Sequence, residues 1–167
     1  QEVQFQVEDR RGDAINCYAN PCITPEQYIE IEIRCNSNSE MLKELLNTPD
    51  NDLGSIVLFD WPLRASSDLL DCSYYNISAY VDQDTLTGSI RDFNCGTNTY
   101  DGHGGTDISI WPFNFYKMDN NLVEIIAAAP GIILDKHDGE FDRNCTANNL
   151  TANYVVIEHS DGSRTLY

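Results

Sequence analysis

Residues 100–110 read YDGHGGTDISI, where a glycine-rich stretch changes into an alternating strand pattern. His103 and Asp107 lie four residues apart, with two glycines between them. Glycines disfavour a helix, so we expect a loop that enters a strand over Asp107–Trp111. Neutral imidazole and carboxylate are both common zinc ligands, so the pair is a candidate metal site. Taken alone, the same spacing is also compatible with two solvated loop residues.

Strand patterns continue from this bend to the end of the sequence. Loops rich in Asp, Asn and Gly separate them, which is typical of an antiparallel sheet. We expect strands at Leu122–Ala128, Gly131–Leu134, Tyr154–Glu158 and Arg164–Tyr167.

Residues 1–90 differ in character and predict a small β-rich domain with one helix. Ser37–Glu40 resembles a capping box ahead of apolar residues that share one helical face, and Thr48-Pro49 would end that helix. Alternating or apolar runs predict strands at Gln4–Val7, Tyr28–Ile33, Ile56–Phe59 and Ser78–Val81. A soft boundary near Ser89–Asp92 therefore predicts two domains, residues 1–90 and 91–167.

The net charge and the lack of a long apolar run argue against nucleic-acid binding and against a membrane span. The chain has 27 acidic and 10 basic residues, a formal net charge of −17. Such a surface repels phosphate backbones, so we expect no nucleic-acid binding. No apolar run reaches membrane-spanning length, so we expect no membrane span.

Several features predict a secreted, periplasmic or cell-surface protein. The sequence begins with Gln1, as a chain processed after secretion would. Six scattered cysteines contain no CxxC pair and predict up to three disulfides, with Cys17–Cys22 and Cys95–Cys145 as two possible pairings. Three glycosylation sequons, at Asn76, Asn144 and Asn149, would matter in a glycosylating host.

Three blocks in order over residues 91–167 resemble the lysostaphin-type zinc metallopeptidases. The first is the run from Cys95 to Ile108 around His103 and Asp107. The second, residues 123–133, resembles the family's V-x-A-x-x-x-G-x-V strand pair, and the third, residues 153–162, resembles its N-x-V-x-I-x-H-x-D-G hairpin. Residues 164–167 resemble the strand that normally leads into a histidine. Residues 1–90 show no such likeness.

The resemblance implies a mainly β fold, an antiparallel sheet of a lysostaphin-type peptidase domain that is incomplete. It also implies Zn²⁺ as cofactor, with His103 and Asp107 as its first two ligands. The family's third ligand comes from a later His-x-His motif, and a catalytic histidine follows the tyrosine that matches Tyr167; this sequence contains neither. The site is therefore expected to be truncated or completed by another chain, and no catalytic residue is assigned.

The function implied is that of a secreted zinc metalloendopeptidase acting on peptides, most naturally the peptide bridges of peptidoglycan in cell walls. The alternative is a catalytically incomplete extracellular module of the same fold that binds or scaffolds. A third reading is a surface-assembly subunit whose exposed sheet edge is covered by a second chain.

Several other residues could also bind a metal or a substrate, but each has a simpler structural explanation. His159 precedes a turn and is expected to be structural, although it could be a further ligand. A cation could bind at the acidic turn Asp135–Asp142, which contains His137, or at the run Asp50–Asp52. Both stretches are more typical of solvent-exposed turns. The aromatic runs at Trp61 and Trp111–Tyr116 favour packing over a substrate platform.

Overall fold

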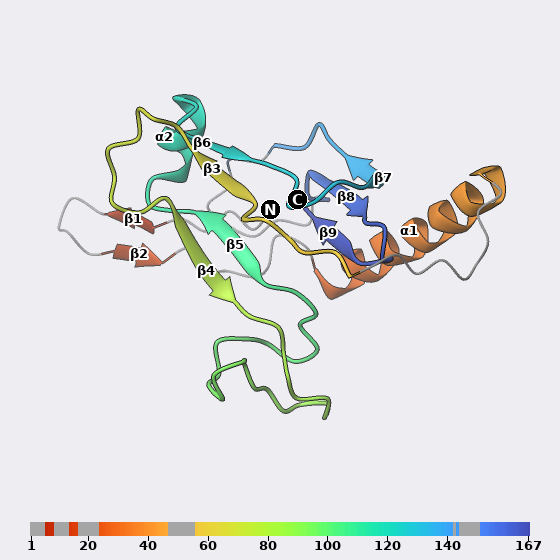
Figure 1. Cartoon of the computed structure of the whole chain (residues 1–167). Helices are drawn as coiled ribbons and strands as arrows, with labels where there is room; N and C mark the ends of the chain where they lie inside the picture. The colour runs from red at the N-terminus through yellow and green to blue at the C-terminus, as the bar shows by residue number, and fades with distance from the viewer. Residues whose placement is uncertain (1–5, 9–13, 17–23, 47–55, 142, 144–150) are drawn as a thin grey trace. The chain divides into compact units, whose positions relative to one another are not determined.

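The computed structural model describes residues 6–8, 14–16, 24–46, 56–141, 143 and 151–167 (Figure 1). The chain is fairly rich in β structure, with small antiparallel sheets and two helices among these residues. The elements are β1 (Gln6–Glu8), β2 (Ala14–Asn16), α1 (Pro25–Leu46), β3 (Leu63–Ala65), β4 (Tyr75–Ala79), β5 (Asp107–Ile110), α2 (Asn114–Asp119), β6 (Val123–Ile125), β7 (Ile132–His137), β8 (Tyr154–Glu158) and β9 (Arg164–Leu166).

The chain folds into two compact units, and each is built from two segments of sequence. The first unit comprises residues 1–18 and 65–123, and the second comprises residues 19–64 and 124–167. The boundary predicted near Ser89–Asp92 lies inside the first unit, whose longer segment is continuous across it. Because compact units need not coincide with inherited domains, the division into residues 1–90 and 91–167 stays a prediction.

The first unit contains the hairpins and the long loop that carries the glycine-rich stretch. β1 pairs with β2, and β4 pairs with β5 in antiparallel register. A bulge interrupts the second ladder between Ile77 and Ala79, so that Ala79 pairs with Asp107. Residues 80–106 form an irregular loop from the end of β4 back to the start of β5 (Figure 1).

The second unit packs α1 against the three-stranded sheet β7-β8-β9. Both ladders of this sheet are antiparallel. Its core consists of Ile31 and Cys35 from α1 and Leu134, Tyr154 and Val156 from the sheet, all at most 6% exposed. Burial of the Cys35 side chain raises the pKa of its thiol, as expected for a thiol used in packing.

The strand predicted at Tyr28–Ile33 is wrong, because these residues lie in α1. Thr24 and Gln27 form a reciprocal capping box: the Gln27 N–H donates to Thr24 Oγ1 at 3.2 Å, and the Thr24 N–H donates to Gln27 Oε1 at 2.9 Å. The helix that starts there buries Ile31 and leaves Ile29 and Ile33 58% and 63% exposed. The alternation of isoleucine and glutamate therefore does not mark a buried strand face.

The capping box predicted at Ser37–Glu40 is also wrong, since these residues lie in the middle of α1. They connect the helix to the sheet instead. Asn38 Nδ2 donates to the Leu134 carbonyl at 2.7 Å, and the buried Ser39 hydroxyl donates to Glu158 Oε1 at 2.7 Å. The predicted helix at 41–46 is confirmed as the last part of α1, whereas Thr48-Pro49 lies outside the described residues.

Most of the strands predicted in the second half of the chain are confirmed. β5, β8 and β9 match the predicted ranges to within a residue, and β6 and β7 overlap theirs. In the first half, β1 and β4 overlap the strands predicted at Gln4–Val7 and Ser78–Val81. Residues 56–59 are irregular rather than a strand, and α2 was not anticipated.

Residues 56–59 are held by a carboxylate in the turn between β8 and β9. Asp161 Oδ2 accepts the Val57 N–H at 2.8 Å, and Oδ1 accepts the backbone N–H of Ser163 at 3.0 Å and its hydroxyl. The Ser163 hydroxyl, followed by the Val57 N–H, lowers the pKa of the Asp161 carboxyl to about 2. The ionised carboxylate therefore ties an exposed apolar segment to the hairpin.

This contact predicts a loss of stability in acid. Because the folded pKa of about 2 lies below the unfolded value near 3.9, the contribution of Asp161 is complete above about pH 4 and is lost as the pH falls towards 2. Asp161→Asn should therefore be less stable than wild type at pH 6, and the difference in urea midpoint should shrink between about pH 4 and pH 2. A difference that stays constant down to pH 2 would contradict this assignment. Asp68→Asn, at an exposed carboxyl, serves as the control.

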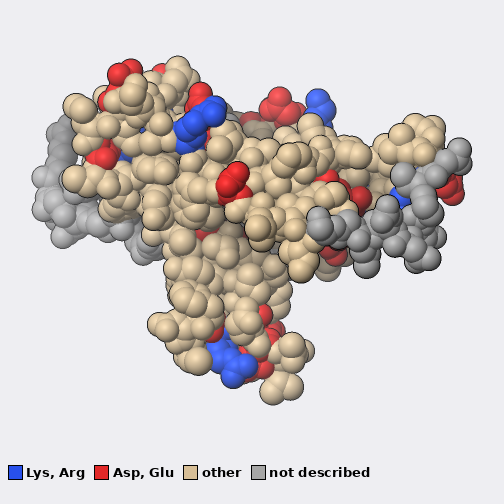
Figure 2. All heavy atoms as spheres, in the orientation of Figure 1, with Lys and Arg blue, Asp and Glu red and all other residues tan. Residues whose placement is uncertain are grey.

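The charged side chains can be followed on one face of the molecule. On the face drawn in Figure 2, acidic and basic side chains are dispersed over the described surface. In the part of the chain that the structure describes, no helix combines the length and apolarity needed to cross a membrane.

Candidate metal centre

The candidate centre is formed where the 80–106 loop meets β5. Asp107 is the first residue of β5, and His103 lies in the turn just before it, with its backbone N–H donating to the Tyr100 carbonyl at 3.0 Å. Gly102 has a φ of +74°, a left-handed conformation that glycine adopts without strain. Neither Gly104 nor Gly105 has a positive φ, so the bend depends on Gly102 rather than on the two glycines of the His–Asp interval.

The structure brings the two predicted ligands together. His103 Nε2 lies 3.1 Å from Asp107 Oδ1. The imidazole side chain is 7% exposed and the carboxylate 26% exposed, so the pair is largely withdrawn from water but open on the side of the aspartate. Tyr100 stacks on the imidazole with ring centroids 4.1 Å apart and an interplanar angle of 22°. Tyr100 thereby covers one face of the ring.

The second ring nitrogen of His103 fixes which nitrogen can bind a cation. Nδ1 lies 2.8 Å from the Tyr80 carbonyl oxygen, and a carbonyl oxygen can only accept. Nδ1 must therefore carry a proton, which we assign from its partner. In the neutral ring Nε2 then holds a lone pair, and this lone pair points at a carboxylate oxygen that is also an acceptor.

Two acceptors at 3.1 Å repel one another unless they share a cation. One solution is a second proton on His103, which would make the contact an ion pair between imidazolium and carboxylate. The other solution is a metal ion bound to both atoms. A histidine that binds a metal through one ring nitrogen usually donates a hydrogen bond from its other ring nitrogen to a carbonyl or carboxylate. His103 has this arrangement, with Nδ1 bonded to the Tyr80 carbonyl.

The separation of the two atoms fits a zinc ion. With bonds of about 2.0–2.2 Å, two ligand atoms of a tetrahedral zinc lie about 3.4 Å apart. The observed 3.1 Å between Nε2 and Oδ1 requires only a small adjustment. No group of three or more His, Cys, Asp or Glu side chains that could hold a metal occurs among the described residues. His103 and Asp107 therefore supply two protein ligands, one fewer than a catalytic zinc normally has.

Asp82 holds the loop that carries His103. Its backbone N–H donates to the His103 carbonyl at 2.7 Å, and its Oδ2 accepts the Gly102 N–H at 3.0 Å. Backbone N–H groups of Asp84 and Arg91 donate to its other oxygen, and these bonds lower the pKa of the Asp82 carboxyl. The ionised carboxylate thus fixes the turn that presents the imidazole.

The same loop is tied at a second point, which sequence reasoning did not find. Thr99 Oγ1 donates to the Tyr80 carbonyl at 2.7 Å, so this oxygen accepts from both Thr99 and His103. Asp92 accepts the backbone N–H groups of Gly96, Asn98 and Asn94, which lower the pKa of its carboxyl. The aspartates could have been noted as turn residues, but their distance of up to 21 positions from His103 hides the contact in the sequence.

The other two histidines are engaged locally in the second unit. His159 is buried, with Nδ1 2.9 Å from the Pro130 carbonyl and Nε2 2.8 Å from Thr165 Oγ1. Its structural role is the one expected from the sequence. His137 Nε2 lies 3.2 Å from Glu140 Oε1.

The acidic turn around His137 does not converge on a common point. Asp135 pairs with Arg34 at 2.8 Å, and Asp138 accepts the backbone N–H of Gly139. Asp142 and the run Asp50–Asp52 lie outside the described residues. In the described part of this turn only His137 and Glu140 approach one another, and no group of three possible metal ligands forms.

The aromatic run Trp111–Tyr116 is more exposed than packing would require. Phe113 and Tyr116 are 66% and 62% exposed. α2 instead buries Lys117, whose ammonium lies 2.5 Å from Asp71 Oδ2 and 2.5 Å from the Pro112 carbonyl. This run follows β5, but nothing described here makes it a substrate surface.

Three of the six cysteines can be placed. Cys35, Cys72 and Cys95 are free thiols. Cys17, Cys22 and Cys145 lie outside the described residues, and both suggested pairings involve them. Because Cys95 is a free thiol, the Cys95–Cys145 pairing is not formed in the structure, whereas Cys17–Cys22 stays a prediction.

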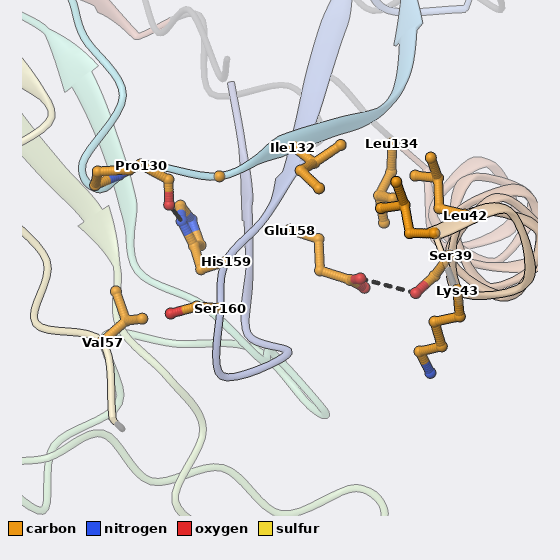
Figure 3. Close-up of a pocket in the computed structure, with 12 residues that line it drawn as sticks. Ser39, Leu42, Lys43, Val57, Pro130, Ile132, Leu134, Glu158, His159 and Ser160 are labelled. Atoms are coloured by element: carbon orange, nitrogen blue, oxygen red, sulfur yellow. Dashed lines mark hydrogen bonds between the residues drawn. The ribbon is translucent and has the colours of Figure 1, made fainter. Parts of the chain in front are cut away.

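A hollow of about 520 Å³ lies elsewhere, in the second unit between α1 and the sheet (Figure 3). Leu42 of α1 lies on the side of Ile132 and Leu134 of β7, and Pro130 and Val57 lie at the other end. Leu46 also lines the hollow. The polar groups at its base, Glu158 and His159, already bond to other protein groups. The groove is thus lined mainly by apolar side chains, and its Glu158 and His159 groups are already hydrogen-bonded within the protein.

The comparisons with known proteins do not place the chain in a family. No family model matches it, and neither the curated proteins nor the solved structures contain a match. Assignment of a function therefore depends on the His103–Asp107 geometry and on the sequence blocks around it.

Proposed function

We propose that the chain is part of a secreted zinc metalloendopeptidase of the lysostaphin type, with peptidoglycan peptide bridges as the substrate class. The observation that carries the proposal is the approach of His103 Nε2 and Asp107 Oδ1 to 3.1 Å while Nδ1 is committed to the Tyr80 carbonyl. A cation between the two atoms resolves the repulsion of two acceptors. The antiparallel hairpin β8–β9, which carries the third sequence block, supports the same reading.

The residues of this chain would bind and orient the ion. His103 and Asp107 would hold it, the Tyr80 carbonyl would keep the imidazole in the required tautomer, and Tyr100 would shield the ring from water. A bound zinc would polarise the scissile carbonyl and lower the pKa of a coordinated water. The third ligand and the catalytic histidines of the family would have to come from residues that this sequence does not contain.

Two ligands in one chain also favour a second candidate, an extracellular module that binds peptidoglycan or a surface protein without cutting it. The supporting observation is that the described residues offer no third metal ligand. Such a module would use the ion, if at all, to stiffen the 80–106 loop. A partner chain that completes the sheet would give a third arrangement.

One experiment separates these proposals. The chain is incubated with purified peptidoglycan in the presence of zinc, and both new amino termini and bound protein are measured. Because a two-ligand site holds zinc weakly, the enzyme proposal predicts cleavage only when a segment with a His-x-His motif is supplied, either on the same polypeptide or by a partner. Binding without new amino termini in both forms would favour the module. A downstream sequence without His-x-His, together with no partner that supplies it, would defeat the enzyme proposal.

A further inference from the structure

Ser109 of β5 carries a buried hydroxyl that has no hydrogen-bond partner. The residue is 3% exposed, and its Oγ is one of two buried side-chain atoms without a partner among the described residues. A buried hydroxyl that bonds to nothing is unfavourable, since it has lost water and gained no partner. An unpartnered polar atom of this kind calls for a hydrogen-bond partner that the described structure does not give it.

The position of Ser109 on its strand suggests which group it serves. Side chains alternate across a strand, so Asp107 and Ser109 lie on the same face of β5. Their Cα atoms are about 6.6 Å apart, as follows from the rise per residue. A serine hydroxyl and an aspartate carboxylate can span that distance with ordinary rotamers. Within β5, Asp107 is therefore the nearest polar side chain on this face, and it is the proposed metal ligand.

We propose that Ser109 is a positioning residue for the metal centre, whose hydroxyl donates to the Asp107 carboxylate when the ion is bound. This inference rests on the proposed zinc site. Asp107 Oδ1 faces His103, and a carboxylate that binds a metal through one oxygen normally has a hydrogen-bond donor on the other. The Ser109 hydroxyl would supply this hydrogen bond and would thereby gain the partner that it lacks.

One other polar group competes for the Ser109 hydroxyl. Asn76 of β4 pairs directly with Ser109 and shares its face of the hairpin. If Ser109 serves Asn76 rather than Asp107, removing the hydroxyl would leave metal binding unchanged. The two assignments therefore differ in what a substitution does to zinc affinity.

The test measures zinc affinity and thermal stability in parallel on the full chain. Ser109→Ala is compared with Ser109→Thr, which keeps the hydroxyl on a residue suited to a strand. Ile108→Val, on the opposite face of β5, controls for altered packing. Zinc dissociation constants come from competition with a chromogenic chelator, and melting temperatures come from the metal-free proteins.

Ser109→Ala should bind zinc about tenfold more weakly, in line with other supporting residues of metal ligands. Its metal-free melting temperature should stay unchanged or rise, because an unpartnered buried hydroxyl is removed. Ser109→Thr should restore affinity to within about threefold of wild type, and Ile108→Val should bind zinc like wild type. Affinity in Ser109→Ala equal to wild type would overturn the inference while leaving the zinc site intact. If wild type binds no more zinc than His103→Ala, the proposed function and this inference fail together.

Discussion

Replacing His103 with alanine is expected to abolish measurable zinc binding. Because a two-ligand site holds zinc weakly, the wild-type chain should approach one zinc per molecule only as the metal concentration is raised to saturation at neutral pH, and the variant should take up none above background. The physical reason is that Nε2 is the nitrogen donor of a two-ligand site, so the variant keeps only the Asp107 carboxylate. Metal content after equilibration in zinc-buffered solution measures the effect.

The fold should tolerate the loss of this imidazole. The Tyr80 carbonyl, which accepts from His103 Nδ1, also accepts from Thr99 Oγ1 at 2.7 Å and so is not left without a donor. A matched control is His137→Ala, which removes an imidazole that contacts Glu140 in the second unit. Retention of zinc by His103→Ala, or an equal loss in both variants, would remove the basis of the metal centre.

The metal itself provides a further check on the same site. Because protons and zinc compete for the Nε2 lone pair, zinc affinity should fall as the pH is lowered. His103→Ala lacks this imidazole, so any residual zinc affinity of the variant should not show this pH dependence. An affinity in wild type that did not change with pH would indicate that zinc binds through carboxylates elsewhere on this acidic chain.

Replacing Gly131 with alanine is expected to be strongly destabilising. Gly131 lies just before β7, where its backbone passes very close to the neighbouring β8. An added Cβ would lie 2.5 Å from Ile157 Cγ2, closer still to the Glu158 carbonyl oxygen, and 3.0 Å from His159 Nδ1. Ile157 and Glu158 belong to the paired strand β8, and both ring nitrogens of His159 form hydrogen bonds. These groups therefore cannot move aside without breaking existing contacts.

Overpacking against backbone costs about 3 kcal/mol at the upper end of the usual range. For a chain of this size the melting temperature should fall by about 10 °C. The measurement is thermal unfolding followed by circular dichroism. Gly105→Ala is the control, because a Cβ there meets nothing within 4 Å and its φ is not left-handed. A Gly131→Ala variant as stable as the control would show that β7 and β8 are less closely packed than described.

Local patterns predicted the strands of the second unit well. Tyr154–Glu158 was recognisable as a mostly apolar run bounded by turn residues. Arg164–Leu166 follows it across the short turn at residues 160–163, so the contacts of this hairpin are close in sequence. The same reasoning failed for α1. Its isoleucines alternate with glutamates, yet the capping box at Thr24 starts a helix, and packing of Ile31 against the distant Tyr154 stabilises it.

The candidate site was predictable only as far as its two ligands. His103 and Asp107 are near each other in sequence, so a pattern could propose them, and the structure brings their side chains together. The groups that aim the imidazole, Tyr80 and Asp82, come from the far side of a long loop. Ser109 has no signal in the sequence at all, because its isolation is visible only once its burial is known.

The carbonyl oxygen of Tyr80 receives both the Thr99 hydroxyl and the His103 ring, and this has a consequence for how the loop can vary. The acceptor belongs to the main chain, so it is offered by any amino acid at position 80. Residues of this loop such as the exposed Gly104 and Gly105 can therefore be substituted without changing the direction of the His103 imidazole. The direction of the imidazole thus depends on the backbone path, which the Asp82 carboxylate holds, and not on the identity of the side chain at position 80.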